Sequence, residues 1–332
     1  MAAHPTPDRF FDMLSGIQRT AVLRTAVELG ICDAIAGGAV TAAAIAARAG
    51  ASEKGVRILC DYLCTVGLLE KAAAGYSLSG EAAFFLVSSS PAYLGGTIRF
   101  LLGDAIRAGY DNLTQAVRQG STALAAGSMA PEHPMWCDFA LAMVPMMMPA
   151  AMFMAGAVHR DGPCKILDVA AGHGIFGIKL AQRNPEARVV ACDWAAVLEV
   201  ARENAQAAGV ADRWTALPGS IFEVDPGGGY DLILLTNFLH HFSPSTNETL
   251  LRKVHGQLAP GGRCVTLEFV PNADRISPPQ AAQFAAVMLA TTGEGDAYPF
   301  AEYEAMFAAA GFASSEHVII PGFPGSLIVS SL

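Results

Sequence analysis

The chain has 332 residues, of which 52% are hydrophobic and 15% are charged, and its formal net charge at pH 7 is -9. This apolar composition excludes a disordered chain, and the length suffices for about two domains. The acidic balance argues against a general affinity for nucleic acid, because phosphate backbones attract basic surfaces.

The cysteines number seven, and no two of them form a Cys-x-x-Cys pair. Neither a disulfide framework nor a zinc knuckle is therefore indicated. The first residues contain no apolar signal segment, so we expect reduced thiols in a cytoplasmic protein.

The run 139–158 has no charged residue and is long enough to cross a membrane. Pro145 and Pro149 interrupt it, which favours two buried helical pieces broken at the prolines and no membrane partner.

Residues 1–95 read as short helices followed by a hairpin. Thr41 and Ser52 each precede a helical pattern, and β-like pieces at 68–71 and 76–78 flank a short turn. Helix, helix and hairpin form a winged-helix pattern. The second helix of this pattern, 53–66, has only two basic residues and so lacks the face that DNA recognition requires. We interpret residues 1–95 as a winged-helix-like dimerisation domain, with a ligand-sensing DNA-binding regulator as the least favoured alternative.

Residues 96–160 are expected to form a helical linker that contributes to a substrate pocket. The end of this segment is rich in methionine, whose flexible side chain suits an adaptable apolar wall. The composition of this wall indicates a flat, largely apolar ligand.

Residues 161–332 alternate between strand-like and helical segments. The strand-like segments are 165–169, 188–192, 213–217, 231–235 and 263–269, and the helical ones are 174–182, 195–208 and 249–258. This alternation predicts a parallel sheet covered on both faces. The tail segments 315–320 and 326–331 are too close in sequence for a parallel crossover and must pair antiparallel. The predicted fold class is α/β, with a Rossmann-like seven-stranded sheet that ends in an antiparallel hairpin.

A glycine-rich turn follows the first strand of this sheet. Gly172, Gly174 and Gly177 form Gly-x-Gly-x-x-Gly between a strand and a helix, and Asp193 ends the next strand. Such a turn lets a nucleotide cofactor approach the backbone, and the carboxylate accepts hydrogen bonds from ribose hydroxyls. Asp168, at the strand end, would repel the pyrophosphate of a dinucleotide but would attract the ammonium group of S-adenosylmethionine. Together with the terminal hairpin, this favours S-adenosylmethionine over NAD.

His240 follows the strand 231–235, and Glu268 lies near the carboxyl end of the next strand. Ligands of open parallel sheets bind beyond these ends, so the two side chains are expected to form a general base and the carboxylate that orients it. His241, adjacent in sequence, is expected to point elsewhere, and no metal site is predicted.

With these motifs, the chain resembles the plant-type and bacterial small-molecule O-methyltransferases, which include caffeic acid, acetylserotonin and polyketide O-methyltransferases. The resemblance covers nearly the whole chain. The family's glycine motif, Leu-Asp-Val-Gly-Gly-Gly-x-Gly, has alanine at two positions here, Ala170 and Ala171. The family's Gly-Asp pair before the adenine-flanking residues is Gly219-Ser220 here, followed by Ile221 and Phe222.

The resemblance also implies the catalytic set. The family motif His-Asp-Trp reads His240-His241-Phe242 here, so the base is retained and the next two residues differ. Glu268 matches an acid that supports the base, and Glu294 or Asp296 is the candidate for a second acid. Family members dimerise through the N-terminal domain, so a homodimer is expected.

The expected cofactor-binding residues are Asp168, Gly172, Gly174, Asp193, Trp194, Gly219, Ser220, Ile221, Phe222 and Asn237. The expected substrate-binding residues are Trp136, Phe139, Met143, Met147 and His241. The expected reaction is methyl transfer to a phenolic hydroxyl, which leaves S-adenosylhomocysteine. Carbon or nitrogen methylation, and non-methyl chemistry on the same fold, remain alternatives.

Overall fold

The computed structural model describes residues 5–124 and 135–332. The chain divides into two compact units, Met1–Ile98 and Arg99–Leu332, each with its own hydrophobic core. Most of the segment 96–160, expected as a linker, thus belongs to the same unit as the sheet. The short helix α7 (Ile98–Leu101) lies at the boundary.

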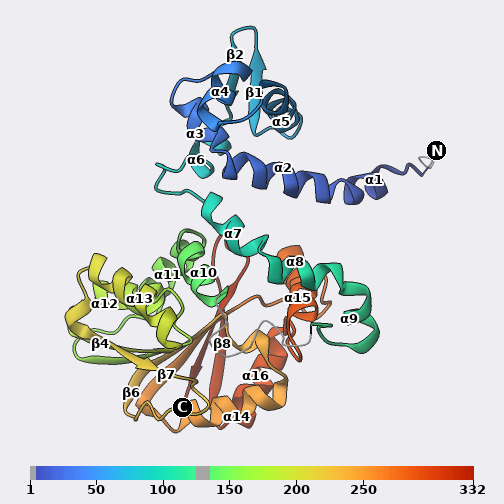
Figure 1. Cartoon of the computed structure of the whole chain (residues 1–332). Helices are drawn as coiled ribbons and strands as arrows, with labels where there is room; N and C mark the ends of the chain where they lie inside the picture. The colour runs from blue at the N-terminus through green and yellow to red at the C-terminus, as the bar shows by residue number, and fades with distance from the viewer. Residues whose placement is uncertain (1–4, 125–134) are drawn as a thin grey trace. The chain divides into compact units, whose positions relative to one another are not determined.

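The first unit contains helices followed by a hairpin, the order that the sequence predicts (Figure 1). Its elements are α1 (Asp8–Leu14), α2 (Gly16–Glu28), α3 (Ile31–Ala36), α4 (Ala42–Ala49), α5 (Glu53–Thr65), β1 (Leu69–Ala72), β2 (Gly75–Leu78), α6 (Gly80–Phe85) and the 3-10 turn η1 (Gly95–Thr97). The hydroxyls of Thr41 and Ser52 accept hydrogen bonds from the first turns of α4 and α5. These caps satisfy amides that a helix leaves unpaired, and they fix where both helices begin.

The core of the first unit lies between these helices and the hairpin, with Ile31, Ile45 and Leu63 among its fully buried side chains. Asp61 on α5 joins the hairpin to the helices, because it accepts hydrogen bonds from Lys71 Nζ at 2.6 Å and Tyr76 Oη at 2.7 Å. The buried face of α5, with Val56, Cys60 and Leu63, therefore belongs to the core of this unit.

The N-terminal helix α1 has no buried residue. Large apolar side chains on α1 and at the start of α2 are exposed instead: Phe10, Phe11, Met13, Leu14 and Ile17. An apolar stripe of this kind is typical of a surface that another chain covers.

The second unit is built on a seven-stranded sheet in the order β5-β4-β3-β6-β7-β9-β8. Its strands are β3 (Cys164–Val169), β4 (Ala187–Asp193), β5 (Trp214–Pro218), β6 (Tyr230–Thr236), β7 (Leu258–Glu268), β8 (Ser314–Ile319) and β9 (Ser326–Ser331). The first five strands pair parallel, while β9 runs antiparallel to both β7 and β8. The predicted α/β fold with its terminal antiparallel hairpin is confirmed.

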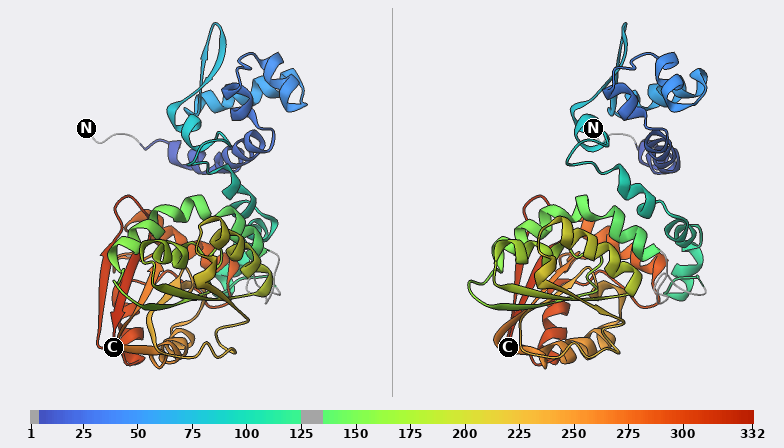
Figure 2. Two further views of the ribbon diagram at one scale, coloured as in Figure 1. Left: turned by 90° about the vertical axis from the view of Figure 1, so that its left-hand side faces the viewer. Right: turned by 60° about the vertical axis from the view of Figure 1, so that its left-hand side comes forward.

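Helices cover both faces of this sheet (Figures 1 and 2). The helices of this unit that follow α7 are α8 (Asp104–Asp111), α9 (Leu113–Gln119), α10 (Met135–Ala142), α11 (Val144–Ala157), α12 (Ile175–Arg183), α13 (Ala195–Ala207), α14 (Pro244–His255), α15 (Pro279–Thr291) and α16 (Phe300–Ala309). Of these, α8 and α9 pack against α15. Alternate residues of a strand serve different faces. Ile166 belongs to the core beneath α11 and α12, whereas Leu167 belongs to the core beneath α14 and α16.

Two elements begin several residues earlier than the sequence predicts. Helix α14 begins at Pro244 rather than at residue 249, because Ser243 caps it and proline suits a first helical position. Strand β7 begins at Leu258 rather than at residue 263 and pairs with Tyr230 across a register shift.

The apolar run 139–158 forms the second half of α10 and all of α11, and these helices pack against α13 and α12 respectively. Pro145 lies in the first turn of α11 as expected, but Pro149 lies inside the helix and does not break it. Among the described residues, no single helix is long and apolar enough to cross a membrane. The bent pair α10 and α11 passes that test only when both helices are taken together.

The hairpin turn of the first unit yields a stability prediction. Gly75 has φ of 129°, and a Cβ there would lie 2.1 Å from the Val40 carbonyl oxygen, which accepts the Tyr76 amide. We expect Gly75→Ala to destabilise the protein by more than about 1 kcal/mol, seen as a lower Tm in calorimetry. Gly38→Ala is the matched control, because Gly38 has φ of 92° but open space around it. Equal losses in Tm would contradict this steric explanation.

Candidate active site

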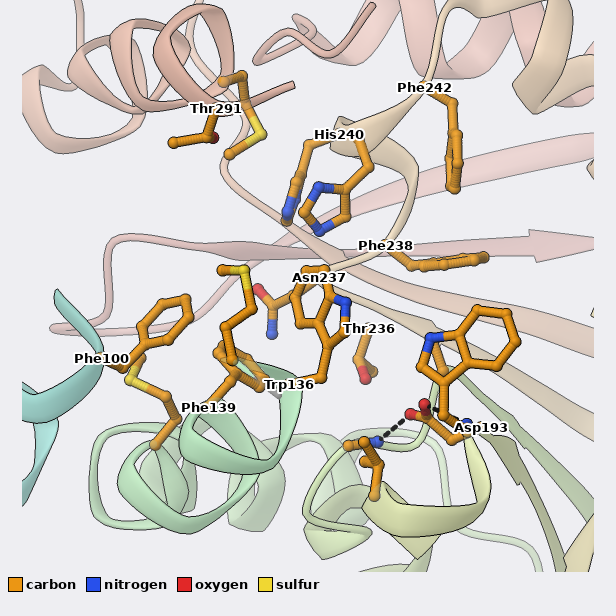
Figure 3. Close-up of a pocket in the computed structure, with 18 of the residues that line it drawn as sticks. Phe100, Trp136, Phe139, Asp193, Thr236, Asn237, Phe238, His240, Phe242 and Thr291 are labelled. Atoms are coloured by element: carbon orange, nitrogen blue, oxygen red, sulfur yellow. Dashed lines mark hydrogen bonds between the residues drawn. The ribbon is translucent and has the colours of Figure 1, made fainter. Parts of the chain in front are cut away.

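A cavity of about 500 Å³ lies at the carboxyl ends of the parallel strands. Segments that follow β3, β4, β5 and β6 form one part of its wall, and α8, α10, α11 and α15 form the other. In Figure 3, Asp193 and His240 lie at opposite ends, with Thr236, Asn237 and Phe238 between them. The cavity is therefore where an open α/β sheet is expected to bind its ligand.

Asp193 forms the polar end of this cavity. Its Oδ2 accepts a hydrogen bond from the Gly172 amide at 2.8 Å, and its Oδ1 accepts one from the Trp194 amide at 2.7 Å. A carboxylate has about four acceptor positions, so each oxygen can accept one further donor. Burial raises the pKa of Asp193 to about 6. The side chain is thus held in place with acceptor capacity directed at a ligand.

The turn after β3 brings its backbone to the cavity. Gly172 lines the wall with φ of 56°, and Ala170, which stands where the family motif has glycine, has φ of 51°. A left-handed alanine is strained, so the turn keeps the glycine geometry despite the substitution. Gly174 does not line the cavity. A Cβ there would lie 3.0 Å from Ala201 Cβ, so this glycine allows α12 and α13 to approach closely.

Asp168, the other acid predicted to meet the cofactor, lies behind the turn and not in the cavity wall. Its Oδ2 accepts a hydrogen bond from the Gly177 amide at 3.1 Å, and its Oδ1 is buried with no hydrogen-bond partner among the described residues. Burial raises the pKa of Asp168 to about 7. Asp168 therefore anchors the first turn of α12, next to the glycine turn, and its contact with a cofactor stays a prediction.

The turn after β6 forms the opposite end of the cavity, and the buried Glu268, which is not itself part of the wall, holds this turn in place. The Glu268 Oε1 atom accepts hydrogen bonds from the amides of Phe238 at 3.0 Å and Leu239 at 2.8 Å. Its Oε2 atom lies 2.5 Å from Nδ1 of His240. Glu268 is 0% exposed and His240 is 3% exposed. One buried carboxylate thus fixes both the backbone of the turn and the imidazole, as the sequence interpretation of these two residues anticipates.

His241 differs from the expectation. The expectation that it points away from His240 is wrong, because the two ring centroids lie 4.3 Å apart, whereas its place among the expected substrate-binding residues agrees with its position in the cavity wall. Both residues lie in the 3-10 turn η3 (Leu239–His241), and both rings reach the same cavity. Burial, and then the nearby His240, lower the pKa of His241 well below 6.5.

The acids Glu294 and Asp296 do not complete a catalytic set. Neither lines the cavity. Asp296 forms an ion pair with Arg275 at 3.1 Å, and Glu294 lies 3.5 Å from the Thr246 hydroxyl. In the part of the chain that is described, Glu268 is the acid that hydrogen-bonds to His240.

Every predicted substrate-binding residue lines the cavity, and so does every predicted cofactor-binding residue except Asp168 and Gly174. Sequence reasoning missed several wall residues: Phe100, Ile106, Tyr110, Phe269, Phe284, Val287, Met288 and Thr291. Those from α15 belong to an apolar helix that carries no motif. The one indication in the sequence was that α15 follows soon after the strand that ends at Glu268.

The charged side chains of the cavity wall indicate which cofactor the cavity can bind. Asp193 and Glu223 are its only charged side chains other than histidine within the described lining, and that lining holds no lysine or arginine. A cationic sulfonium compound with ribose hydroxyls suits this environment, whereas a pyrophosphate does not. No group of three or more metal-ligating side chains occurs among residues 5–124 and 135–332. The fold and the site thus define an S-adenosylmethionine-dependent methyltransferase.

Comparisons with known proteins identify the family. Residues 146–313 match the O-methyltransferase domain, and residues 11–88 match the O-methyltransferase dimerisation domain. A crystal structure from Nostoc punctiforme, of a protein described as an O-methyltransferase, is 48% identical with a TM-score of 0.96 and covers 99% of both chains. The chain belongs to the O-methyltransferase family that uses S-adenosylmethionine.

Two further relatives are more distant. The 3-hydroxy-5-methyl-1-naphthoate 3-O-methyltransferase of Streptomyces sahachiroi is 28% identical over 90% of this chain and 87% of its own length. Human N-acetylserotonin methyltransferase, solved in complex with S-adenosylmethionine, has a TM-score of 0.87 at 21% identity and covers 100% of this chain and 99% of its own. This last likeness is one of fold.

The raised pKa of Asp193 predicts pH-dependent ligand binding. As the pH falls through about 6, the carboxylate gains a proton and loses acceptor positions, so affinity for S-adenosylhomocysteine should fall. Calorimetric titrations between about pH 5 and pH 8 measure this dependence. Asp193→Asn should bind S-adenosylhomocysteine more weakly than the wild type. Because the amide gains no proton in this range, its affinity should not fall as the pH falls through about 6. The account fails if wild-type affinity is the same across that range.

Proposed function

We propose that this enzyme methylates a hydroxyl group of a small, uncharged, largely apolar aromatic molecule, with His240 as the general base. The observation that carries the proposal is the hydrogen bond between Glu268 and Nδ1 of His240 on the wall of the cavity. Carbon and nitrogen methylation stay weaker candidates, because a base held by a carboxylate is what an acceptor hydroxyl requires.

S-adenosylmethionine supplies an electrophilic methyl group when bound. We propose that Asp193 accepts the ribose hydroxyls, since both of its oxygens are held by backbone amides and keep acceptor capacity. The remaining proposed cofactor residues in the wall are Gly172, Trp194, Gly219, Ser220, Ile221, Phe222 and Asn237. Asp168 acts on this site through the Gly177 amide and the turn.

The proposed role of His240 follows from its hydrogen bond. When Nδ1–H donates to Glu268, Nε2 has a lone pair available to the cavity, and no described residue bonds to it. Nε2 can then accept the proton of the substrate hydroxyl as the oxygen attacks. Proton removal of this kind contributes about 10²- to 10⁴-fold, and orientation of the oxygen contributes more.

The walls around His240 support an uncharged aromatic substrate. Phe139, Met143, Met147 and Trp136 present flat or flexible apolar surfaces from α10 and α11. A carboxylate on the substrate would find no lysine or arginine in the described lining. Here the proposal departs from the Streptomyces relative, whose name specifies a naphthoate.

The function is tested by incubation with labelled S-adenosylmethionine and an extract of the producing organism, followed by mass spectrometry and NMR of the labelled product. A product that has gained one methylene as an O-methyl group is expected. A label on carbon or nitrogen, or no labelled small molecule, would contradict the proposal.

His240→Ala should lower methyl transfer by about 10²- to 10⁴-fold, because the proton acceptor is lost. Calorimetry should show unchanged affinity for S-adenosylhomocysteine, since His240 is proposed to act on the substrate. His159→Ala is the matched control, because His159 is exposed and lies outside the cavity wall. Undiminished turnover in His240→Ala would rule out the base.

We also propose that the protein is a homodimer through its dimerisation domain, residues 1–95, followed by a pocket-forming helical segment, 96–160, and the methyltransferase domain, 161–332. The exposed apolar side chains of α1 support this assembly. All seven cysteines are free, which supports a reducing, cytoplasmic environment.

Sedimentation analysis should therefore give the mass of a dimer for the full chain. Phe11→Asp with Leu14→Asp should shift the mass towards a monomer, because a charge in an apolar interface is costly. Val117→Asp, a change at an exposed apolar position on α9, is the control and should leave the dimer intact. A double variant that stays dimeric would place the interface elsewhere.

A further inference from the structure

Two imidazoles stand side by side on the cavity wall. The rings of His240 and His241 are tilted by 55° with centroids 4.3 Å apart. An aromatic ring packs edge-on against each imidazole. The ring centroid of Phe284 lies 4.8 Å from that of His240, and the ring centroid of Trp136 lies 5.7 Å from that of His241. The proposed base uses only one of these imidazoles, so the second lacks a role.

The hydrogen-bonding states of the two rings are complementary. His240 donates from Nδ1 to Glu268, so its Nε2 is an acceptor. In His241 the Nδ1 atom is buried and has no hydrogen-bond partner among the described residues. A buried N–H without an acceptor is costly, which favours the tautomer that carries the proton on Nε2. Since His241 lines the cavity, this Nε2–H is the nitrogen left to face a ligand.

His241 also stays uncharged. Burial and the adjacent His240 keep its pKa well below 6.5, so it is a neutral donor near neutral pH. A metal ion between the two rings is disfavoured, because Nδ1 of His240 is engaged and no third ligand is grouped with them in the described chain. The wall thus offers one acceptor and one donor, next to each other and without charge.

We propose that His241 donates a hydrogen bond to a second substrate oxygen, next to the hydroxyl that His240 deprotonates, so that the enzyme selects aromatic hydroxyls with a neighbouring carbonyl or ether oxygen. This inference rests on the proposed function. In such compounds the hydroxyl proton is held by its neighbouring oxygen. Donation from His241 to that oxygen weakens the internal hydrogen bond and leaves the hydroxyl proton available to Nε2 of His240.

Binding of two isomeric probes tests this selection. The hydroxyl of 1-hydroxyanthraquinone is next to a carbonyl, whereas that of 2-hydroxyanthraquinone is not. Calorimetry with the full-length protein and S-adenosylhomocysteine should show tighter binding of the 1-isomer, by about two- to tenfold for one neutral hydrogen bond. His241→Phe should remove this preference by weakening binding of the 1-isomer alone.

Two further variants separate hydrogen bonding from shape. His241→Gln retains an N–H donor on a side chain of similar length and should restore part of the preference. His159→Phe makes the same kind of change at an exposed residue outside the cavity wall and should leave the preference unchanged. A preference that is absent from the wild type, or that survives in His241→Phe, would overturn the inference.

Turnover separates this inference from the proposed function. If the 1-isomer binds preferentially through His241 but no hydroxyl substrate is methylated, the proposed function fails and the selection stands. If hydroxyl methylation depends on His240 while the two isomers bind equally, the selection fails and the proposed function stands.

Discussion

The structure of the site depends on one buried carboxylate. Glu268, at the end of β7, accepts hydrogen bonds from two successive amides of the turn after β6 and from Nδ1 of His240. The turn begins at Asn237, whose φ of 53° reverses the chain, and its amide bonds to the carbonyl of Leu267. Two neighbouring strands are thereby locked together where they open onto the cavity. Without Glu268, two buried amides and an imidazole would lose their partner, a large cost in this environment.

The other features of the site result from the positions of the strand ends in the sheet and from the negative charge of the cavity wall. Asp193 lies at the end of β4, and its oxygens hold the glycine turn and the start of α13. This acid and the absence of lysine and arginine from the described lining suit a cationic cofactor and an uncharged acceptor. The helices that complete the wall are apolar, which excludes water from the region where His240 would accept a proton.

The sheet, its terminal hairpin and the pair His240 and Glu268 could be predicted from the sequence, because strand ends and glycine turns leave local signals. The role of α15 could not, since its apolar residues look like ordinary core. The orientation of His241 was also beyond sequence reasoning, because no local motif marks the short 3-10 turn η3 in which it lies. Asp168 illustrates a third limit: its position at a strand end was evident, but its hydrogen bond with the Gly177 amide of α12 was not.

The protonation state of the His240 ring tests the central claim most directly. Nitrogen NMR of the histidine-labelled protein near neutral pH, with His240→Gln to assign the signals, distinguishes the two tautomers. The account predicts that Nδ1 carries the proton and that Nε2 does not, with this state lost in Glu268→Gln. A neutral ring protonated on Nε2 would contradict it, because such a ring could neither donate to Glu268 nor accept a proton from a substrate.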